Sequence, residues 1–304
     1  MELNYSFIIP HHNTPDLLQR LIDTIPQRDD IEIIVVDDNS DEGRKANITR
    51  SDVRTICIDK VHTKGAGHAR NVGMEVATGK WLLFADADDL YKPGFIDVLD
   101  EHKDDDIEIL FFNVDSVDSD TLIPNNRAKI PSSIIANYDG SEKTTFELLY
   151  LNYSPWNKMI SSQFIKNKKL SYEEILKGND VLFALELASF VKTFKVENRI
   201  LYTLTYYKES LTYGKKTINK YMCTLNNMIH RRTFFKEMGF EKWYRTSIRG
   251  TQNNSPLRFI FGLIRKSPKT GLIVLSNYIF NYYSIWNNSD YYLKQIKLLE
   301  ENGQ

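Results

Sequence analysis

The sequence predicts a doubly wound α/β fold, in which helices cover both faces of a parallel sheet. Two observations predict it. Short, β-branched apolar runs alternate with segments whose apolar residues recur at helical spacing, as in βαβ units. The runs at 5–10, 31–36 and 81–85 end in polar side chains, and sheets of this class bind ligands at such strand ends.

The expected elements alternate along the chain. The first helix opens at Pro15, because Thr14 favours the N-cap position and Pro the first helical position. Gly79 fits the C′ position of the second helix. The polar, proline-containing segment 115–137 is expected to be an excursion from the fold rather than a domain boundary. The predicted strands are 5–10, 31–36, 53–58, 81–85, 107–114, 154–160 and 199–204, and the predicted helices follow Thr14, Gly67 and Asp180 and cover 95–102 and 144–151.

Composition excludes several protein classes. The 304 residues are 42% hydrophobic and 26% charged, which is typical of a soluble globular protein with a sizeable core. Cys57 and Cys223 are far apart and form no CxxC motif, which favours a reducing compartment and excludes a thiolate metal site. We find no export signal and no apolar run long enough to span a membrane, so we expect a cytoplasmic protein.

The run 81–85 ends in three carboxylates within four positions, at Asp86, Asp88 and Asp89. Carboxylates are costly to bury, so this cluster predicts an accessible edge that faces a cation. Mg²⁺ and Mn²⁺ prefer carboxylate and phosphate oxygens, which favours a metal site with a phosphate on its far side. The alternative is that Asp89 or a neighbour caps a helix starting near Pro93, which explains one carboxylate better than three.

Four further motifs or residues are candidate sites, and three of them have two interpretations. Asp38 can accept a hydrogen bond from a nucleobase, or the pair at 37–38 can form an Asx turn. The glycine loop before Arg70 favours phosphate binding at a helix start, although it lacks the third glycine of a dinucleotide motif. Asp180 precedes an apolar helix, where it can act as a general base or as a cap. Trp156 is either a stacking platform for a sugar or a core aromatic.

Together these motifs resemble the family 2 glycosyltransferases, which have the GT-A, or nucleotide-diphospho-sugar transferase, fold with a mixed sheet. The resemblance covers residues 5–213, and the motifs stand in the order of the family. They are Ile8-Ile9-Pro10 with Asn13, the run 34–40, Gly67-(x)-Ala69-Arg70-Asn71, the run 79–89, Pro155-Trp156-Asn157-Lys158, Gly178-Asn179-Asp180, and Tyr206-Tyr207 with Ser210-Leu211-Thr212.

The resemblance implies a donor site for a nucleotide sugar, which in this family is commonly a UDP-sugar. Pro10 and Asn13 would line the nucleotide pocket, and Asp38 would face the base. Lys64 and Arg70 would lie near the base or the diphosphate.

The resemblance also implies the remaining roles. Asp86 would contact the ribose or diphosphate, and Asp88 would bind a divalent metal, Mn²⁺ or Mg²⁺. Asp180 would be the general base, and Trp156 and Asn179 would belong to the acceptor or sugar pocket. Many relatives carry Glu where this chain has Asn179, so an acid that often lies near the acceptor is lost.

The implied activity is a metal-dependent hexosyltransferase that inverts the anomeric carbon during the synthesis of a bacterial surface polysaccharide. Its acceptor would be a glycan or a lipid-linked saccharide. One alternative is a sugar-phosphate nucleotidyltransferase, which would need a glycine-rich, basic loop directly after the first strand, where this chain has Pro10 and two histidines. The other is a non-catalytic sugar-nucleotide-binding protein, which would need no base at Asp180.

The charge distribution predicts two regions, a glycosyltransferase domain at 1–214 and a helical, basic region at 215–304. The segment 215–289 holds 13 Lys and Arg against two acids, whereas the whole chain has a net charge of −1. Cations interleaved with aromatics suit an anionic membrane surface, which would place the protein on the inner face of the membrane. The alternative is a helical appendage that pairs with the acidic domain. No nucleic-acid motif is present, so we expect no nucleic-acid partner.

Overall fold

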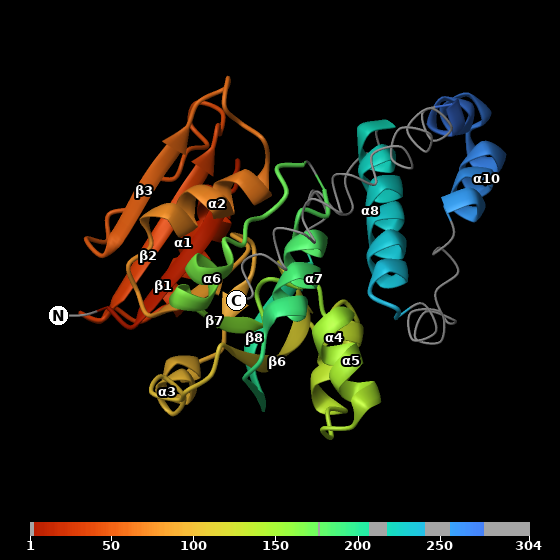
Figure 1. The fold of residues 1–304 in the computed structure, drawn as a ribbon. Coiled ribbons are helices and arrows are strands. Elements are labelled where there is room, and N and C mark those ends of the chain that lie inside the picture. The colour runs from red at the N-terminus through yellow and green to blue at the C-terminus, as the bar shows by residue number, and fades with distance from the viewer. Residues whose placement is uncertain (1–2, 176, 207–217, 241–255, 277–304) are drawn as a thin grey trace. The chain divides into compact units, whose positions relative to one another are not determined.

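The computed structural model describes residues 3–175, 177–206, 218–240 and 256–276. The chain forms two compact units, Met1–Lys215 and Lys216–Gln304, and each is described by itself. Figure 1 shows the sheet and helices of the first unit and the helices of the second.

An eight-stranded mixed sheet forms the centre of the first unit, in the order β3-β2-β1-β4-β7-β6-β8-β5. Strands β3, β2, β1 and β4 are parallel to one another, and β6 is parallel to β8. Strand β7 is antiparallel to both of its neighbours, and β5 is antiparallel to β8. The strands are β1 Tyr5–His11, β2 Ile31–Asp38, β3 Val53–Ile58, β4 Trp81–Phe84, β5 Leu90–Tyr91, β6 Ile109–Asp118, β7 Lys158–Ser161 and β8 Phe194–Tyr206.

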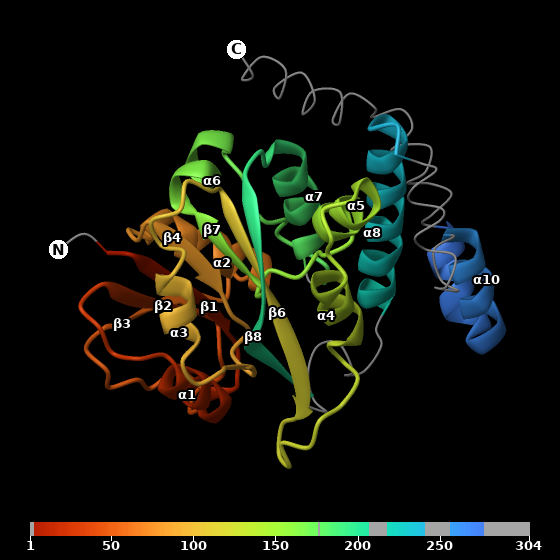
Figure 2. The same cartoon turned by 90° about the horizontal axis from the view of Figure 1, so that it is seen from below.

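Helices cover both faces of this sheet. Helices α1 and α3 lie on one face, and α2, α6 and α7 lie on the other (Figure 2). Their bounds are α1 Pro15–Thr24, α2 Ala66–Val76, α3 Phe95–Asp100, α4 Lys129–Ala136, α5 Glu142–Tyr150, α6 Ser162–Lys168 and α7 Asp180–Phe190. The doubly wound arrangement predicted from the sequence is therefore confirmed.

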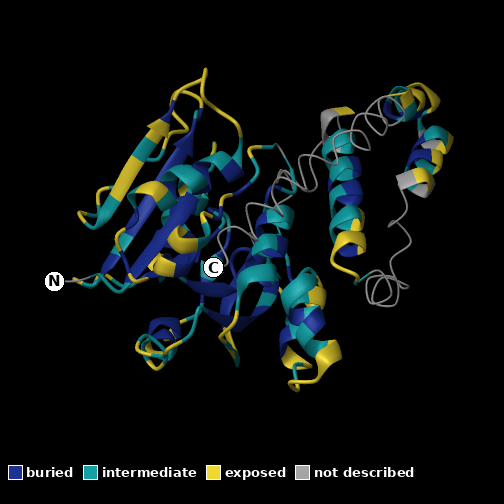
Figure 3. Cartoon of the chain, in the orientation of Figure 1, coloured by how far each residue is buried: buried dark blue, intermediate teal, exposed yellow. Residues whose placement is uncertain are grey.

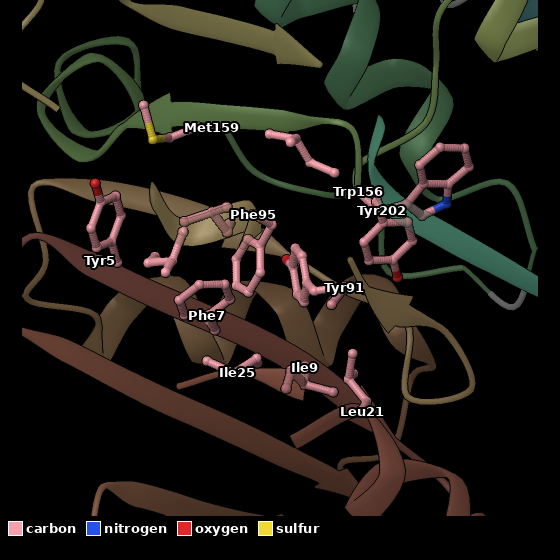
Figure 4. Close-up of a cluster of buried hydrophobic side chains, with 14 of the residues drawn as sticks. Tyr5, Phe7, Ile9, Leu21, Ile25, Tyr91, Phe95, Trp156, Met159 and Tyr202 are labelled. Atoms are coloured by element: carbon pink, nitrogen blue, oxygen red, sulfur yellow. The ribbon is translucent and has the colours of Figure 1, made fainter. Parts of the chain in front are cut away.

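Each face of the sheet has its own hydrophobic core because side chains alternate along a strand. Tyr5, Phe7 and Ile9 of β1 point into one core, and Ile8 points into the other. All four are fully buried, as Figure 3 shows for the central strands. In the first core, Phe7 packs edge-on against Tyr91, and the Tyr91 ring in turn packs against Tyr202 (Figure 4).

The structure differs from the predicted elements at several points. Strand β8 extends to Phe194–Tyr206, beyond the predicted 199–204, and β5, α4 and α6 were not predicted. Gly79 is not at the end of α2, whose C-cap is Ala77. Gly79 lies instead against β1, where a Cβ atom would come within 2.8 Å of the backbone nitrogen of Ser6. A close backbone approach, rather than a helix end, therefore requires glycine there.

The second unit is helical in its described part. It contains α8 (Ile218–Glu237), α10 (Pro256–Lys266) and a further helical stretch at 268–276. A small core joins them, with Leu225 of α8, Ile260 of α10 and Val274 fully buried. The basic motif at 242–249 and the segment 277–289 lie outside the described residues, as do residues 207–212 of the last family motif.

Candidate active site

The order of the strands brings three polar loops to one edge of the sheet. Strand β1 lies between β2 and β4 and is parallel to both, so the carboxyl ends of the three strands are adjacent. The loops that follow them are 12–14, 39–52 and 85–89. The ligand-binding edge predicted from the sequence thus holds the first two motifs and the carboxylate cluster.

Asn13 joins the first two of these loops. Its backbone adopts φ 60°, and its N–H donates to Ser40 Oγ at 2.9 Å. Its side-chain amide donates to Asp41 Oδ2 at 2.9 Å and accepts the Asp41 N–H at 2.8 Å. Pro10 is partly exposed near the end of β1. Asn13 thus fixes the shape of this edge, and the contact of Asn13 and Pro10 with a nucleotide stays a prediction.

The two carboxylates at the end of β2 differ in environment. Asp37 accepts hydrogen bonds from the Ser40 N–H and from His11 Nδ1, both at 2.8 Å, and forms the predicted turn. Burial opposes ionisation of Asp37, but these hydrogen bonds hold its pKa below the usual value. Asp38 accepts from Thr63 Oγ1 at 2.7 Å and from the Gly65 N–H at 3.0 Å. Asp38 is therefore fixed against the start of α2, and its contact with a base stays a prediction.

Arg70 lies between Asp86 and the start of α7. Its guanidinium donates to Asp86 Oδ1 at 2.6 Å and to Asn179 Oδ1 at 2.9 Å, and it lies over the Tyr172 ring. Only 5% of Arg70 is exposed. Burial disfavours its charge, but Asp86, Tyr172 and Asp180 together raise its pKa. Arg70 thus contacts Asn179, which lies 109 positions later in the sequence.

Lys64 forms an ion pair with Glu174, which lies in the segment before α7. The same carboxylate pairs with His68 Nδ1. These contacts hold that segment against the start of α2. At Gly67 the approach is so close that a Cβ atom would lie 2.0 Å from the Glu173 carbonyl oxygen. The predicted contact of Lys64 with the donor stays a prediction.

The residues 85–89 form a turn, which we call the carboxylate turn. Within it, the side chain of Asp89 is held in the protein interior. It is fully buried, and its two oxygens accept from the Thr205 N–H at 2.7 Å and the Tyr202 hydroxyl at 2.9 Å. Burial and the neighbouring carboxylates raise its pKa. The N-cap of α3 is Gly94, so the alternative that this cluster caps the helix near Pro93 is wrong.

The carboxylate of Asp88 differs from that of Asp89 in its hydrogen bonds and exposure. Within the described residues no other residue donates a hydrogen bond to its carboxylate, and its side chain remains partly exposed. Burial and the neighbouring Asp86 raise the pKa of Asp88 to about 6. A bound divalent cation would relieve both effects, so the residues present fit a metal ion.

Glu101, His102 and Glu197 form another group whose side-chain atoms lie within 4.8 Å of one another. Arg199 already donates to Glu101 Oε2 and Glu197 Oε2, both at 2.6 Å. These carboxylates therefore have a cationic partner. The group also lies near the start of β8, whereas Thr205 beside Asp89 lies near its end, roughly 25 Å away along the strand.

Asp180 is the first residue of α7. The side chain of the N-cap residue, Asn179, makes no capping hydrogen bond and instead accepts from Arg70. Burial raises the pKa of Asp180, while Arg70 and Lys158 act in the opposite direction. A carboxylate with a raised pKa is a better proton acceptor than an ordinary one, which suits a general base.

No role was predicted for two side chains near these residues, Lys158 and Tyr202. Lys158 is 3% exposed and donates to the Asn152 carbonyl oxygen at 3.0 Å, and burial lowers its pKa to about 7. Tyr202 stacks on Trp156, which is itself 7% exposed, with ring planes 4° apart. No pattern in the sequence indicates the stacking of Trp156 and Tyr202, because these residues belong to segments far apart in the chain. A role of Trp156 in the acceptor pocket stays a prediction.

Comparison with known proteins identifies the family. The model of glycosyl transferase family 2 matches residues 6–164, which is more than half of the chain. The chain belongs to this family. The recognition made from the ordered motifs is thereby confirmed.

Solved structures of the family support the fold. The Staphylococcus aureus enzyme TarS, residues 1–349 in complex with UDP-GlcNAc, superposes with a TM-score of 0.56 at 17% identity, covering 86% of this chain and 80% of that chain. The mixed sheet and helices thus have the GT-A fold, as the resemblance implied. In the described part of the chain, no helix has the length and apolar character needed to cross a membrane.

Curated relatives match over shorter shares of their own length. The succinoglycan biosynthesis protein ExoO of Rhizobium meliloti is 26% identical over 60% of this chain, which corresponds to 55% of that protein. The Escherichia coli glucosyltransferase WfaP, named for UDP-Glc and α-D-GlcNAc-diphosphoundecaprenol, is 35% identical over 30% of this chain and 37% of its own length. The chain therefore spans about half or less of these relatives.

Proposed function

We propose that this glycosyltransferase transfers a sugar from a UDP-sugar to a glycan or lipid-linked acceptor, with inversion, in the synthesis of a bacterial surface polysaccharide. The observation that carries the proposal is the Arg70 bridge between Asp86 and Asn179, beside Asp180. It joins a carboxylate turn suited to a diphosphate and its cation to the half-buried carboxylate of Asp180, which is suited to proton abstraction. The names of ExoO and WfaP, and the UDP-GlcNAc complex of TarS, support the same class of donor and acceptor.

Asp88 would hold the divalent cation, which when bound supplies positive charge that stabilises the diphosphate leaving group. Asp86 would orient the ribose or diphosphate, with its carboxylate fixed by Arg70. Pro10, Asn13 and Asp38 would form the nucleotide side of the site.

The acceptor side depends on Asp180. Its carboxylate would accept the proton of the acceptor hydroxyl as the acceptor oxygen attacks the anomeric carbon from the face opposite the nucleoside diphosphate. This direct displacement inverts the anomeric carbon and needs no covalent enzyme intermediate. Asn179, held by Arg70, would contribute a neutral amide near the acceptor.

Thermal-shift measurements with a panel of nucleotide sugars, with and without Mn²⁺, test the proposal. We expect at least one UDP-sugar to raise the melting temperature, and only when Mn²⁺ is present. The protein should also hydrolyse that donor slowly in the absence of an acceptor. Tight donor binding without hydrolysis or transfer would favour a non-catalytic binding protein. Formation of a nucleotide sugar from UTP and a sugar phosphate would favour a nucleotidyltransferase.

We also propose that the basic second unit binds an anionic membrane surface, as suits a lipid-linked acceptor. Exposed apolar and cationic side chains occur together in its described part. Leu257, Phe261 and Leu272 are 47%, 56% and 57% exposed, and Arg265 and Lys269 are also exposed. Apolar side chains would enter the lipid interface, and each cation near anionic lipids adds about 1 kcal/mol.

Vesicle flotation tests the membrane proposal. We expect binding to vesicles that contain phosphatidylglycerol, weaker binding at high salt, and no binding to phosphatidylcholine alone. Phe261→Asp should abolish flotation, whereas Ile130→Asp, at a 64% exposed residue of α4, should not. Absence of flotation at low salt would favour a helical appendage that pairs with the acidic domain.

A further inference from the structure

A pair of stacked aromatic rings, Trp156 and Tyr202, lies next to the carboxylate turn at 85–89. The rings of Trp156 and Tyr202 lie parallel, with centroids 5.6 Å apart (Figure 4). Trp156 belongs to the loop before β7, and Tyr202 belongs to β8. Both side chains are buried, so their contact is part of the protein interior.

The Tyr202 hydroxyl makes two hydrogen bonds within the carboxylate turn. It donates to Asp89 Oδ2 at 2.9 Å and accepts the Asp86 N–H at 3.0 Å. The Asp89 N–H donates to the Asp86 carbonyl oxygen at 3.0 Å, which closes the turn on its other side. Asp88 lies between these two fixed residues. One hydroxyl group from a distant strand therefore holds both ends of the turn that presents Asp86 and Asp88, while Thr205 Oγ1 and the Arg20 guanidinium donate to the Asp88 carbonyl oxygen.

The loop that carries Trp156 is also held firmly. The buried Lys158 ammonium donates to the carbonyl oxygens of Asn152 and Ser154 and to Asn157 Oδ1. These three acceptors lie within one short segment, so Lys158 folds the loop onto itself. The Trp156 ring is thereby a rigid support for the Tyr202 ring.

We propose that Tyr202 is a positioning residue that keeps the carboxylate turn in the geometry required for cation-dependent donor binding. The inference rests on the proposed function, because that function assigns the cation and the diphosphate to Asp88 and Asp86. Tyr202 itself would contact neither the cation nor the diphosphate. It acts through the Asp86 N–H and the Asp89 carboxylate, while the Trp156 stack fixes the position of its ring.

Titration calorimetry of UDP binding, with and without Mn²⁺, tests this role with Tyr202→Phe. The substitution keeps the stacked ring and removes only the hydroxyl. Residues that orient metal ligands typically contribute 10–100-fold to metal affinity, so we expect UDP affinity in Mn²⁺ to fall at least ~10-fold. UDP affinity in EDTA should be unchanged. In donor hydrolysis, the Mn²⁺ concentration at half-maximal rate should rise, with kcat at saturating Mn²⁺ nearly unchanged.

Tyr91→Phe is the matched control. The Tyr91 ring lies 5.1 Å from the Tyr202 ring, and its buried hydroxyl has no hydrogen-bond partner among the described residues. The same chemical change there should leave both affinities at the wild-type values. Thermal melts without ligand establish that each variant is folded.

The outcomes separate this inference from the proposed function. Wild-type affinities in both variants would overturn the positioning role and leave the donor site intact. Equal losses in Tyr202→Phe and Tyr91→Phe would also overturn it, because the effect would then arise from core packing. If wild-type protein binds UDP equally with Mn²⁺ and EDTA, the cation-dependent donor site itself is wrong, and the role of Tyr202 falls with it.

Discussion

Asp180→Asn is expected to reduce sugar transfer by about 10²–10⁴-fold while leaving Mn²⁺-dependent UDP binding at the wild-type affinity. The amide keeps the size of the side chain but cannot accept the proton of the acceptor hydroxyl. Steady-state transfer and calorimetry on the same preparations measure the two effects. As the pH is lowered, the wild-type rate should begin to fall at a pH above ~3.9, the ordinary pKa of aspartate. The reason is that burial raises the pKa of Asp180.

Stability measurements separate this catalytic role from a helix-stabilising one. Burial makes the ionised Asp180 unfavourable, so a neutral Asn should leave the free energy of unfolding unchanged or raise it at pH 7. Glu142→Gln is a suitable control, because Glu142 is an exposed acid in the first turn of α5 and should not affect transfer. Wild-type turnover in Asp180→Asn would exclude Asp180 as the general base.

Asp88→Ala is expected to remove the effect of Mn²⁺ on UDP binding. Loss of a metal ligand should lower UDP affinity in Mn²⁺ by on the order of 100-fold, to the value measured in EDTA. Folding should not suffer, because burial and Asp86 already make the ionised Asp88 unfavourable. Calorimetry with Mn²⁺ and with EDTA measures the difference.

Asp104→Ala controls for a general loss of negative charge, since the side chain of Asp104 is 84% exposed. It should retain the full response to Mn²⁺. If Asp88→Ala also retained that response, the cation would bind elsewhere. Glu197→Gln would then test the group formed by Glu101, His102 and Glu197.

The sequence correctly predicted that polar residues gather at one edge of the sheet, because this grouping depends on local patterns. Apolar runs defined β1, β2 and β4, and the polar residues directly after them are brought together by parallel pairing. The identity of the family followed from the same segments. The different environments of Asp88 and Asp89 could not be predicted, because they depend on β8, which lies more than 100 residues later.

The missed elements have physical explanations. Strand β5 has two residues, Leu90–Tyr91, which is too short for a recognisable alternation. Helix α4 contains Pro131, which usually ends a helix but is tolerated here in the first turn, where the N–H has no helical partner. The Arg70 bridge to Asn179 gave no local signal, since neither residue type indicates a partner so distant in sequence.

The dependence of the carboxylate turn on β8 has a consequence for synthesis of the protein. The turn at 85–89 leaves the ribosome long before Tyr202 and Thr205, which complete its hydrogen bonds. Contacts with such large sequence separation form slowly, because closing the intervening loop costs entropy. A nascent chain that already contains the segment matched by the family model, 6–164, would therefore lack an ordered carboxylate turn. The ability to bind a donor together with a cation would arise only when β8 joins the sheet.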